Sequence, residues 1–176
     1  MQNGLISRLG LGTVQFGQVY GIANQRGKIP KQEAFEILKY AQGVGLKTLD
    51  TSVAYGNSEE IIGEFSSEGQ FSFEVISKLV ANSDPLSQDH MDRTLQESLH
   101  RLQNGQLYGC LIHRFDDFLK HDNLWEILEG FKKNSLLIKQ FITPINRDDI
   151  YSAKYRVPLK KTTVFIKEYN YFNGKL

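Results

Sequence analysis

Three apolar segments of this chain end on ionisable residues, and these residues are the ones best suited to chemistry. Asp50 ends LKTLD, Lys78 ends FEVISK and His113 ends YGCLIH. Tyr55 follows Asp50 by five positions. An ammonium beside a buried phenol stabilises the phenolate, so Lys78 is expected to lower the pKa of Tyr55 from about 10 toward a value useful for proton transfer.

The four side chains together would suit protonation or deprotonation of an oxygen atom. Tyr55 would act as the general acid, Asp50 would keep Lys78 charged and oriented, and His113 would hydrogen-bond a substrate oxygen. None of the four can supply a hydride, so a cofactor is implied. Taken alone, each residue also has an ordinary structural interpretation, as a helix cap, a solvated amine or a hydrogen-bonded histidine. Their joint placement favours a site.

The elements that would position these residues alternate between short β-like segments and longer helical ones. The β-like segments are RLGLGTVQF, LKTLDTS, FSFEVISK, GQLYGCLIH, LLIKQFI and KTTVFIKEYNYF. The helical segments are KQEAFEILKYAQGVG, SEEIIGEF, DHMDRTLQESLHRLQ and DNLWEILEGFKKN, with RDDIYSAKY as a shorter candidate. Strand starts about thirty residues apart are typical of βα units. The pattern predicts an α/β fold with a parallel sheet, in one domain over residues 1–176.

The helical segments carry their own start and stop signals. An apolar stripe at i, i+3, i+4 and i+7 is formed by Ala34, Ile37, Leu38 and Ala41. That helix is predicted to stop near Gly43 or Gly45. Asn57 with Glu60 three residues later resembles a capping box, and Asp122 is the expected cap of the helix in DNLWEILEGFKKN.

A parallel sheet would bring the candidate residues together. Neighbouring strands lie about 4.8 Å apart, and the loops after their carboxyl ends form the working face of such folds. Asp50, Lys78 and His113 are therefore expected to share one pocket with Tyr55, which lies in the loop beyond Asp50.

Composition argues against several other classes of protein. The chain has 21 basic and 20 acidic residues without a long basic block, so neither nucleic acid nor a membrane surface is an expected partner. Its only cysteine, Cys110, cannot form an internal disulfide, and the amino terminus lacks the pattern of a secretory signal. No apolar run approaches the roughly 20 residues needed to span a bilayer. A cytoplasmic protein is expected.

The remaining candidates favour structural interpretations. Cys110 and His113 have C-x-x-H spacing, but on a strand this odd offset points them to opposite faces, which argues against a metal site. Trp125 is interpreted as a packing residue. The other histidines, interpreted as surface groups, are His90, His100 and His121.

The segments that carry the candidate residues resemble those of the aldo-keto reductases, which are NAD(P)H-dependent carbonyl reductases built on a (β/α)8 barrel. The resemblance rests on SRLGLGTVQFG, LDTSVAYGNSE, ISK and LIH, and covers roughly residues 7–140. The opening LGTVQFGQVYGIAN is similar to bacterial members connected with sugar and surface-polysaccharide metabolism.

This resemblance implies a reaction and a set of contacts. The family's catalytic tetrad corresponds to Asp50, Tyr55, Lys78 and His113. In the implied reaction Tyr55 protonates the carbonyl oxygen as a hydride passes from the nicotinamide to the carbon. Gly12 and Thr13, together with Asp50, match positions near the nicotinamide ribose. The implied cofactor is NADPH, with NADH as the alternative, and the implied partner is a small-molecule carbonyl compound such as an aldehyde, a ketone or a sugar.

The sequence departs from the family after the fifth strand. Pro144 stands where a nicotinamide-contacting Ser is expected, unless Thr143 takes that role, and Ile166 and Glu168 replace a Gln and a Pro in the sixth strand. A complete barrel needs about 250 residues, so 176 residues predict an incomplete (β/α)8 barrel of the TIM type, with about six of eight βα units. The alternative is a truncated, inactive remnant that self-associates through open sheet edges or binds a partner.

Overall fold

A parallel sheet with helices packed against it organises the chain. The computed structural model describes residues 9–22, 24–69, 72–81 and 86–141. The strands are β1 (Gly10–Gly12), β2 (Thr48–Asp50), β3 (Glu74–Leu79), β4 (Leu107–Ile112) and β5 (Leu137–Phe141). They lie in the order β1-β2-β3-β4-β5, and every neighbouring pair is parallel. The prediction of an α/β fold built from successive crossovers is confirmed.

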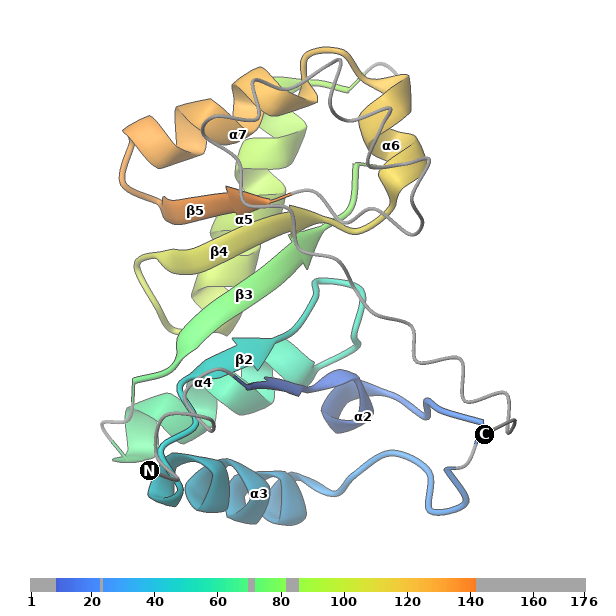
Figure 1. Ribbon diagram of the computed structural model, residues 1–176, viewed down its shortest axis with the longest axis vertical. Helices are drawn as coiled ribbons and strands as arrows, with labels where there is room; N and C mark the ends of the chain where they lie inside the picture. The colour runs from blue at the N-terminus through green and yellow to red at the C-terminus, as the bar shows by residue number, and fades with distance from the viewer. Residues whose placement is uncertain (1–8, 23, 70–71, 82–85, 142–176) are drawn as a thin grey trace.

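Helices connect successive strands along the chain, and the longer of them pack along the sheet (Figure 1). They are α2 (Val14–Gly17), α3 (Lys31–Gly43), α4 (Ser58–Gly69), α5 (Gln88–Arg101), α6 (Phe115–Lys120) and α7 (Leu124–Lys133). The four longer helices match the predicted helical segments. The short helices α2 and α6 were not predicted, because four and six residues are too few to display a helical period. The predicted sixth strand, the RDDIYSAKY helix and the departures at residues 143, 144, 166 and 168 lie outside the described residues.

Helix α3 shows how the periodicity becomes packing. Ala34, Leu38 and Ala41 are buried, as the stripe predicts, and Ile37 is partly buried against the same core. The chain leaves the helix through Gly45, whose φ of +86° lies in the left-handed region that glycine adopts without strain. The predicted stop near this glycine is confirmed.

One of the two predicted helix caps differs from the structure, whereas α4 begins directly after Asn57, as predicted. Asn123 is the N-cap of α7, so the prediction of Asp122 as its cap was wrong. The reason is a turn in which the amide of Leu124 donates to the carbonyl oxygen of His121, which delays the helix by one residue. The Asn57 side chain, expected in a capping box, accepts a hydrogen bond from the Lys28 ammonium.

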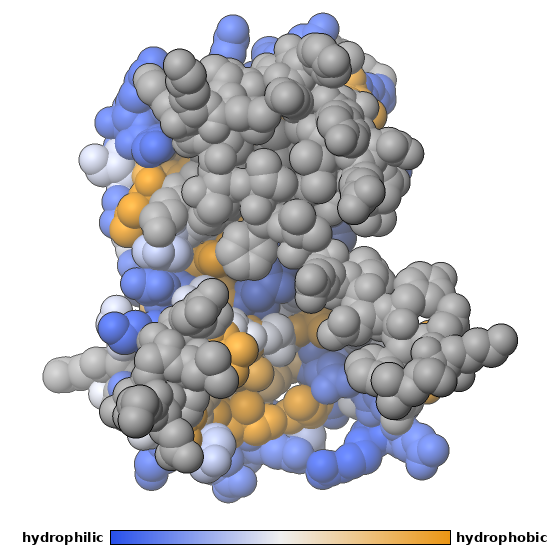
Figure 2. All heavy atoms as spheres, viewed as in Figure 1, coloured by the Kyte–Doolittle hydropathy of each residue, from blue (hydrophilic) through white to orange (hydrophobic). Residues whose placement is uncertain are grey.

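The main core lies between the sheet and the helices, and the strands alternate between its two faces. On β3, Val75 and Leu79 belong to the large core on the helical side, whereas Ile76 packs with Leu111 of β4 on the other face. Figure 2 shows hydrophilic residues around the margin of the face in view and hydrophobic residues nearer its centre. Alternate residues of a strand thus point to opposite sides of the sheet, one toward the helices and one toward the other face.

The burial of the histidines and the tryptophan outside the predicted site differs in part from the prediction. His121 is only 8% exposed, so its interpretation as a surface group was wrong. It caps the carboxyl end of α6, and its amide donates to the carbonyl oxygen of Asp117, which turns the residue inward. His90 is half-buried and His100 is exposed. Trp125 is buried in the main core, which confirms its packing role.

Cys110 lies in the main core, and its chemistry follows from that position. Burial raises the pKa of its thiol from 9.0 to about 12; a backbone hydrogen bond with Leu79 acts in the opposite direction, and the carboxylate of Glu59 adds to the rise. A protonated thiol is a poor nucleophile. We expect Cys110 to react with a thiol reagent at pH 8 many times more slowly in the folded chain than in urea. Equal rates in the two states would contradict this assignment.

The same pKa difference predicts how the pH affects stability. An unfolded thiol ionises above about pH 9, whereas the folded thiol keeps its proton up to about pH 12. The stability that the protonated thiol contributes is therefore fully present below pH 9. It is lost as the pH rises from about 9 to about 12, because only the unfolded thiol ionises in this range. We expect urea titrations to show a steeper alkaline loss of stability in the parent chain than in Cys110→Ala.

Candidate active site

The strand register brings the predicted residues to one face and one edge of the sheet. Asp50 pairs with Ile76, and Lys78 pairs with Leu111. Because residues two apart on a strand face the same side, Lys78 lies on the face of Asp50, and His113 on that of Lys78. Main-chain hydrogen bonds continue the pairing past the ends of β2 and β4, which holds these residues firmly.

Asp50 and Lys78 form an ion pair at this edge. The Lys78 ammonium contacts the Asp50 carboxylate and also donates to the carbonyl oxygen of Thr51 at 3.2 Å. Lys78 is only 3% exposed, whereas the Asp50 side chain is 37% exposed. A buried ammonium needs such partners, because an unpaired charge in the interior is costly. The positive charge of Lys78 is therefore buried, and the carboxylate of Asp50 that pairs with it is exposed at the edge of the sheet.

Tyr55 lies beside this pair, in the loop between β2 and α4. The Lys78 ammonium is 5.2 Å from the centre of the Tyr55 ring, and the ring meets that of His113 edge-on at a centroid distance of 6.0 Å. Tyr55 itself is buried. The structure thus brings together all four residues that the sequence singled out.

Two glycines fix the loop that carries Tyr55. A Cβ atom at Gly17 would lie 1.5 Å from the carbonyl oxygen of Tyr55, and one at Gly56 would lie 2.3 Å from the carbonyl oxygen of Gly17. Gly56 also has a φ of +54°. The end of α2 therefore touches the Tyr55 backbone directly, which only glycine at both positions allows. Their role was not predicted from the sequence.

His113 is held by Ser52. The Ser52 hydroxyl lies 3.0 Å from His113 Nδ1, donates to the carbonyl oxygen of Lys78 at 3.1 Å and accepts from the amide of Ala54 at 3.1 Å. Ser52 is fully buried. It therefore joins the loop after β2 to the ends of β3 and β4. Ser52 was not among the residues predicted from the sequence, since a serine after a strand has no distinctive pattern.

The predicted cofactor positions lie at the ends of β1 and β2. The Thr13 hydroxyl donates to the carbonyl oxygen of Asp50 at 3.1 Å, and Ser58 at the start of α4 donates to the Thr13 hydroxyl at 2.8 Å. Thr13 is fully buried, whereas Gly12 is exposed. A Cβ atom at Gly12 would meet nothing within 4 Å. Open space therefore adjoins Asp50 at Gly12, and Thr13 braces the Asp50 main chain from beneath.

A buried carboxylate braces the other face of β3. Glu59 of α4 is 1% exposed. Its Oε1 accepts hydrogen bonds at 2.6 Å from both Ser77 and Ser98, and its Oε2 pairs with Arg101 at 2.8 Å. Gly63 permits this contact, because a Cβ atom there would lie 2.2 Å from the carbonyl oxygen of Arg101. Glu59 thus ties α4 and α5 to the residue that precedes Lys78.

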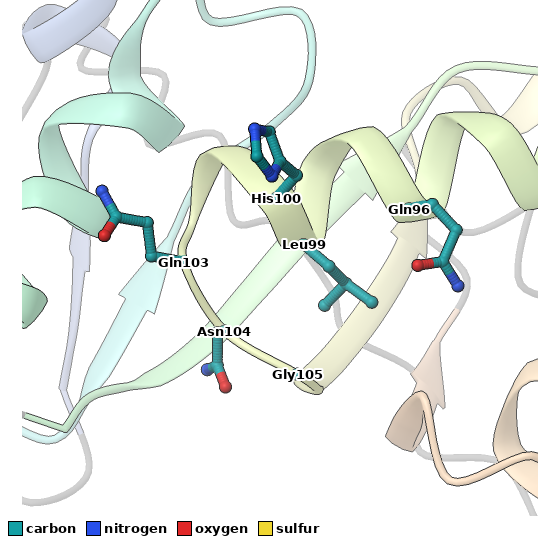
Figure 3. Close-up of a pocket in the computed structure, with 6 residues that line it drawn as sticks. All are labelled: Gln96, Leu99, His100, Gln103, Asn104 and Gly105. Atoms are coloured by element: carbon teal, nitrogen blue, oxygen red, sulfur yellow. The ribbon is translucent and has the colours of Figure 1, made fainter.

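A surface depression elsewhere carries no comparable chemistry (Figure 3). It lies where α5 ends and the chain turns toward β4, at the amino-terminal edge of the strands. Its lining consists of Gln96, Leu99, His100, Gln103, Asn104 and Gly105. Gln103 points toward α4 in Figure 3, and its side chain accepts a hydrogen bond from Ser67. The lining includes the imidazole of His100 but no carboxylate, lysine or tyrosine, so it lacks the combination of groups found around Tyr55.

Two further features concern only the part of the chain that the structure describes. Within it, no three His, Cys, Asp or Glu side chains are grouped so that they could hold a metal ion. Among the helices of residues 9–141, apart from the gaps in that range, none is long and apolar enough to cross a bilayer.

Solved structures of aldo-keto reductases share this fold. An aldo-keto reductase from Pseudomonas aeruginosa, described as putative, superposes with a TM-score of 0.65 at 22% identity, over 88% of this chain and 71% of that one. The holo form of an aldo-keto reductase from Bacillus halodurans gives 0.66 at 18% identity, over 85% and 50%. An aldo-keto reductase from Klebsiella pneumoniae in complex with NADPH gives 0.64 at 19%, over 88% and 52%. The chain thus spans about half the length of the Bacillus halodurans and Klebsiella pneumoniae proteins.

The sequence itself identifies the family. Residues 8–140 match the model of the Aldo/keto reductase family, and this is about three quarters of the chain. No curated protein matches the chain. The chain belongs to the aldo/keto reductase family, and its sheet is the first five strands of that family's barrel.

Proposed function

We propose that this chain is an oxidoreductase that reduces the carbonyl group of a small molecule with NADPH, with Tyr55 as the general acid. The observation that carries the proposal is that the Tyr55 ring lies near both the Lys78 ammonium, 5.2 Å from its centre, and the His113 ring, at a centroid distance of 6.0 Å. Membership of the aldo/keto reductase family supports the reaction class.

The contacts of each residue suggest its role in the reaction. Lys78 is buried and held by Asp50, so its positive charge favours the phenolate that Tyr55 becomes after it gives its proton to the substrate oxygen. His113, held by Ser52 at the end of β4, forms a hydrogen bond with the substrate oxygen and keeps it beside Tyr55. Burial of Tyr55 and Lys78 limits the water that would weaken these interactions.

The residues at the ends of β1 and β2 fit a nicotinamide nucleotide. Gly12 borders open space that a larger side chain would fill, and the exposed Asp50 carboxylate can accept a hydrogen bond from a ribose hydroxyl. Thr13, matched by resemblance to the same region, would act by holding Asp50. When bound, NADPH supplies the hydride that none of these side chains can supply. The NADPH complex of the Klebsiella pneumoniae enzyme favours NADPH over NADH here.

The setting of this reaction follows from the cysteine content. Cys110 is buried and is the only cysteine of the chain. A protein without disulfides suits a reducing compartment, so we place the activity in the cytoplasm.

The direct test measures cofactor binding and turnover on the same preparation. We expect NADPH to bind saturably in calorimetry and to quench the fluorescence of Trp125 and the tyrosines. We also expect oxidation of NADPH at 340 nm when a nitrobenzaldehyde is added, with the alcohol as the product. Absence of binding up to millimolar NADPH would reject the proposal and favour the catalytically silent alternative. Binding without turnover on a panel of aldehydes, ketones and sugars would reject the reaction and leave a nucleotide-binding protein.

A further inference from the structure

We propose that Ser52 is a positioning residue that fixes His113 in the tautomer with its proton on Nδ1. The proposal deepens the function proposed above, since it specifies the form in which His113 meets the substrate oxygen. It rests on three contacts of one buried hydroxyl: with the carbonyl oxygen of Lys78 at 3.1 Å, with the amide nitrogen of Ala54 at 3.1 Å and with His113 Nδ1 at 3.0 Å.

The tautomer follows from counting protons at Ser52 Oγ. A hydroxyl donates one hydrogen bond and accepts two. The Lys78 carbonyl oxygen can only accept, so the Ser52 proton is directed to it. The Ala54 amide can only donate, and it takes one lone pair of Oγ. The second lone pair then faces His113, and the contact is a hydrogen bond only if Nδ1 carries a proton.

The opposite assignment is less favourable. If Ser52 donated to His113 Nδ1, its oxygen and the carbonyl oxygen of Lys78 would face each other at 3.1 Å without a proton between them. Ser52 is fully buried, so water could not relieve this contact. The carbonyl oxygen of Lys78 would keep its hydrogen bond from the amide of Val53, but the close contact of two oxygens with facing lone pairs is unfavourable. The arrangement with Nδ1 protonated uses all three contacts.

This tautomer determines which hydrogen bonds Nε2 can form. In the neutral ring Nε2 carries the lone pair and accepts a hydrogen bond from a hydroxyl. Only the imidazolium donates from both nitrogens. A neutral His113 therefore suits the alcohol, which has a proton to give, and a protonated His113 suits the carbonyl oxygen. Removal of the Ser52 hydroxyl takes away the acceptor for the Nδ1 proton, so the preference for this tautomer should weaken.

The test observes the tautomer by NMR and needs neither cofactor nor turnover. Histidine labelled with ¹⁵N is incorporated into the full chain, and long-range ¹H–¹⁵N correlations are recorded at pH 8, where a neutral ring reports its protonated nitrogen. Comparison with His113→Asn assigns the signals among the four histidines. We expect the parent chain to show Nδ1–H at His113. In Ser52→Ala we expect the ratio of the two tautomers to move about tenfold toward Nε2–H, the effect of one buried hydrogen bond.

Two further variants make the comparison specific. Ser52→Thr keeps a hydroxyl and is expected to restore Nδ1–H. Ser66→Ala removes a hydroxyl that donates to the carbonyl oxygen of Ile62 within α4, and is expected to leave the His113 signals unchanged. An Nε2–H signal in the parent chain, or an unchanged ratio in Ser52→Ala, would overturn the proposal. If Ser52→Ala does not fold, the parent spectrum alone decides.

The outcome is independent of whether the chain reduces carbonyl compounds. An Nδ1–H tautomer without NADPH binding would support the role of Ser52 and reject the proposed function. An Nε2–H tautomer together with turnover would reject the role of Ser52 and support the proposed function.

Discussion

Tyr55→Phe is expected to lower kcat for aldehyde reduction by about 10²–10⁴-fold while NADPH binds with unchanged affinity. The change removes only the phenolic hydroxyl, so the ring keeps its positions beside the Lys78 ammonium and the His113 ring. Without a proton donor, the developing charge on the substrate oxygen has only hydrogen bonds to stabilise it. The measurement is single-turnover oxidation of NADPH with saturating aldehyde, alongside calorimetric titration of NADPH.

Tyr40→Phe is the matched control. Tyr40 lies on α3 and is 74% exposed, so its hydroxyl is already in water and its loss should leave both kcat and stability unchanged. If Tyr55→Phe retained the parent rate, Tyr55 would not be the general acid. If both variants lost activity equally, the loss would reflect tyrosine replacement in general and not the site.

Glu59→Gln is expected to lower the free energy of unfolding by about 3 kcal/mol, the lower end of the range for removal of one partner from a buried ion pair. The lower end applies because the Arg101 side chain is 26% exposed and can turn partly toward water. An amide nitrogen in place of Oε2 would face the Arg101 guanidinium, which can only donate, and one in place of Oε1 would require the hydroxyls of Ser77 and Ser98 to accept where they now donate. Urea titration monitored by circular dichroism measures the loss.

Glu60→Gln is the control for this prediction, because Glu60 is the next residue of α4 and is exposed. Its replacement should change the free energy of unfolding by no more than about 0.5 kcal/mol. A difference of less than about 1 kcal/mol between the two variants would mean that the Glu59 network contributes little. A loss of activity in Glu59→Gln at a temperature where the variant is fully folded would show that the bracing of β3 extends to Lys78.

The helices and strands could be predicted from the sequence because hydrophobic residues recur with a different period in each. The stripe of α3 and the parity of β3 follow from local geometry, and the parallel order follows from the alternation of strands with helices. The four residues of the candidate site were also readable, since each lies at or just after a strand end. Parallel strands bring such ends to one edge whatever the rest of the sequence is.

Errors arose where a residue's environment depends on contacts that leave no periodic pattern in the sequence. His121 and Asp122 follow a short helix, and the turn that joins α6 to α7 determines which of them is buried and where the next helix begins. In sequence, neither residue differs from an ordinary surface residue. The roles of Ser52 and of Gly17 were missed for the same reason, since their partners lie on other elements.

By itself, the sequence determined which side chains could transfer a proton and the strand ends that present them, because strand parity and βα alternation are local properties. Only the tertiary structure decided which of the adjacent carboxylates Glu59 and Glu60 is buried. The partners of Glu59 lie 18, 39 and 42 positions further along the chain. Helical periodicity reports which residues share a face, but the desolvation of a charge depends on hydrogen-bonding groups that other elements bring to it.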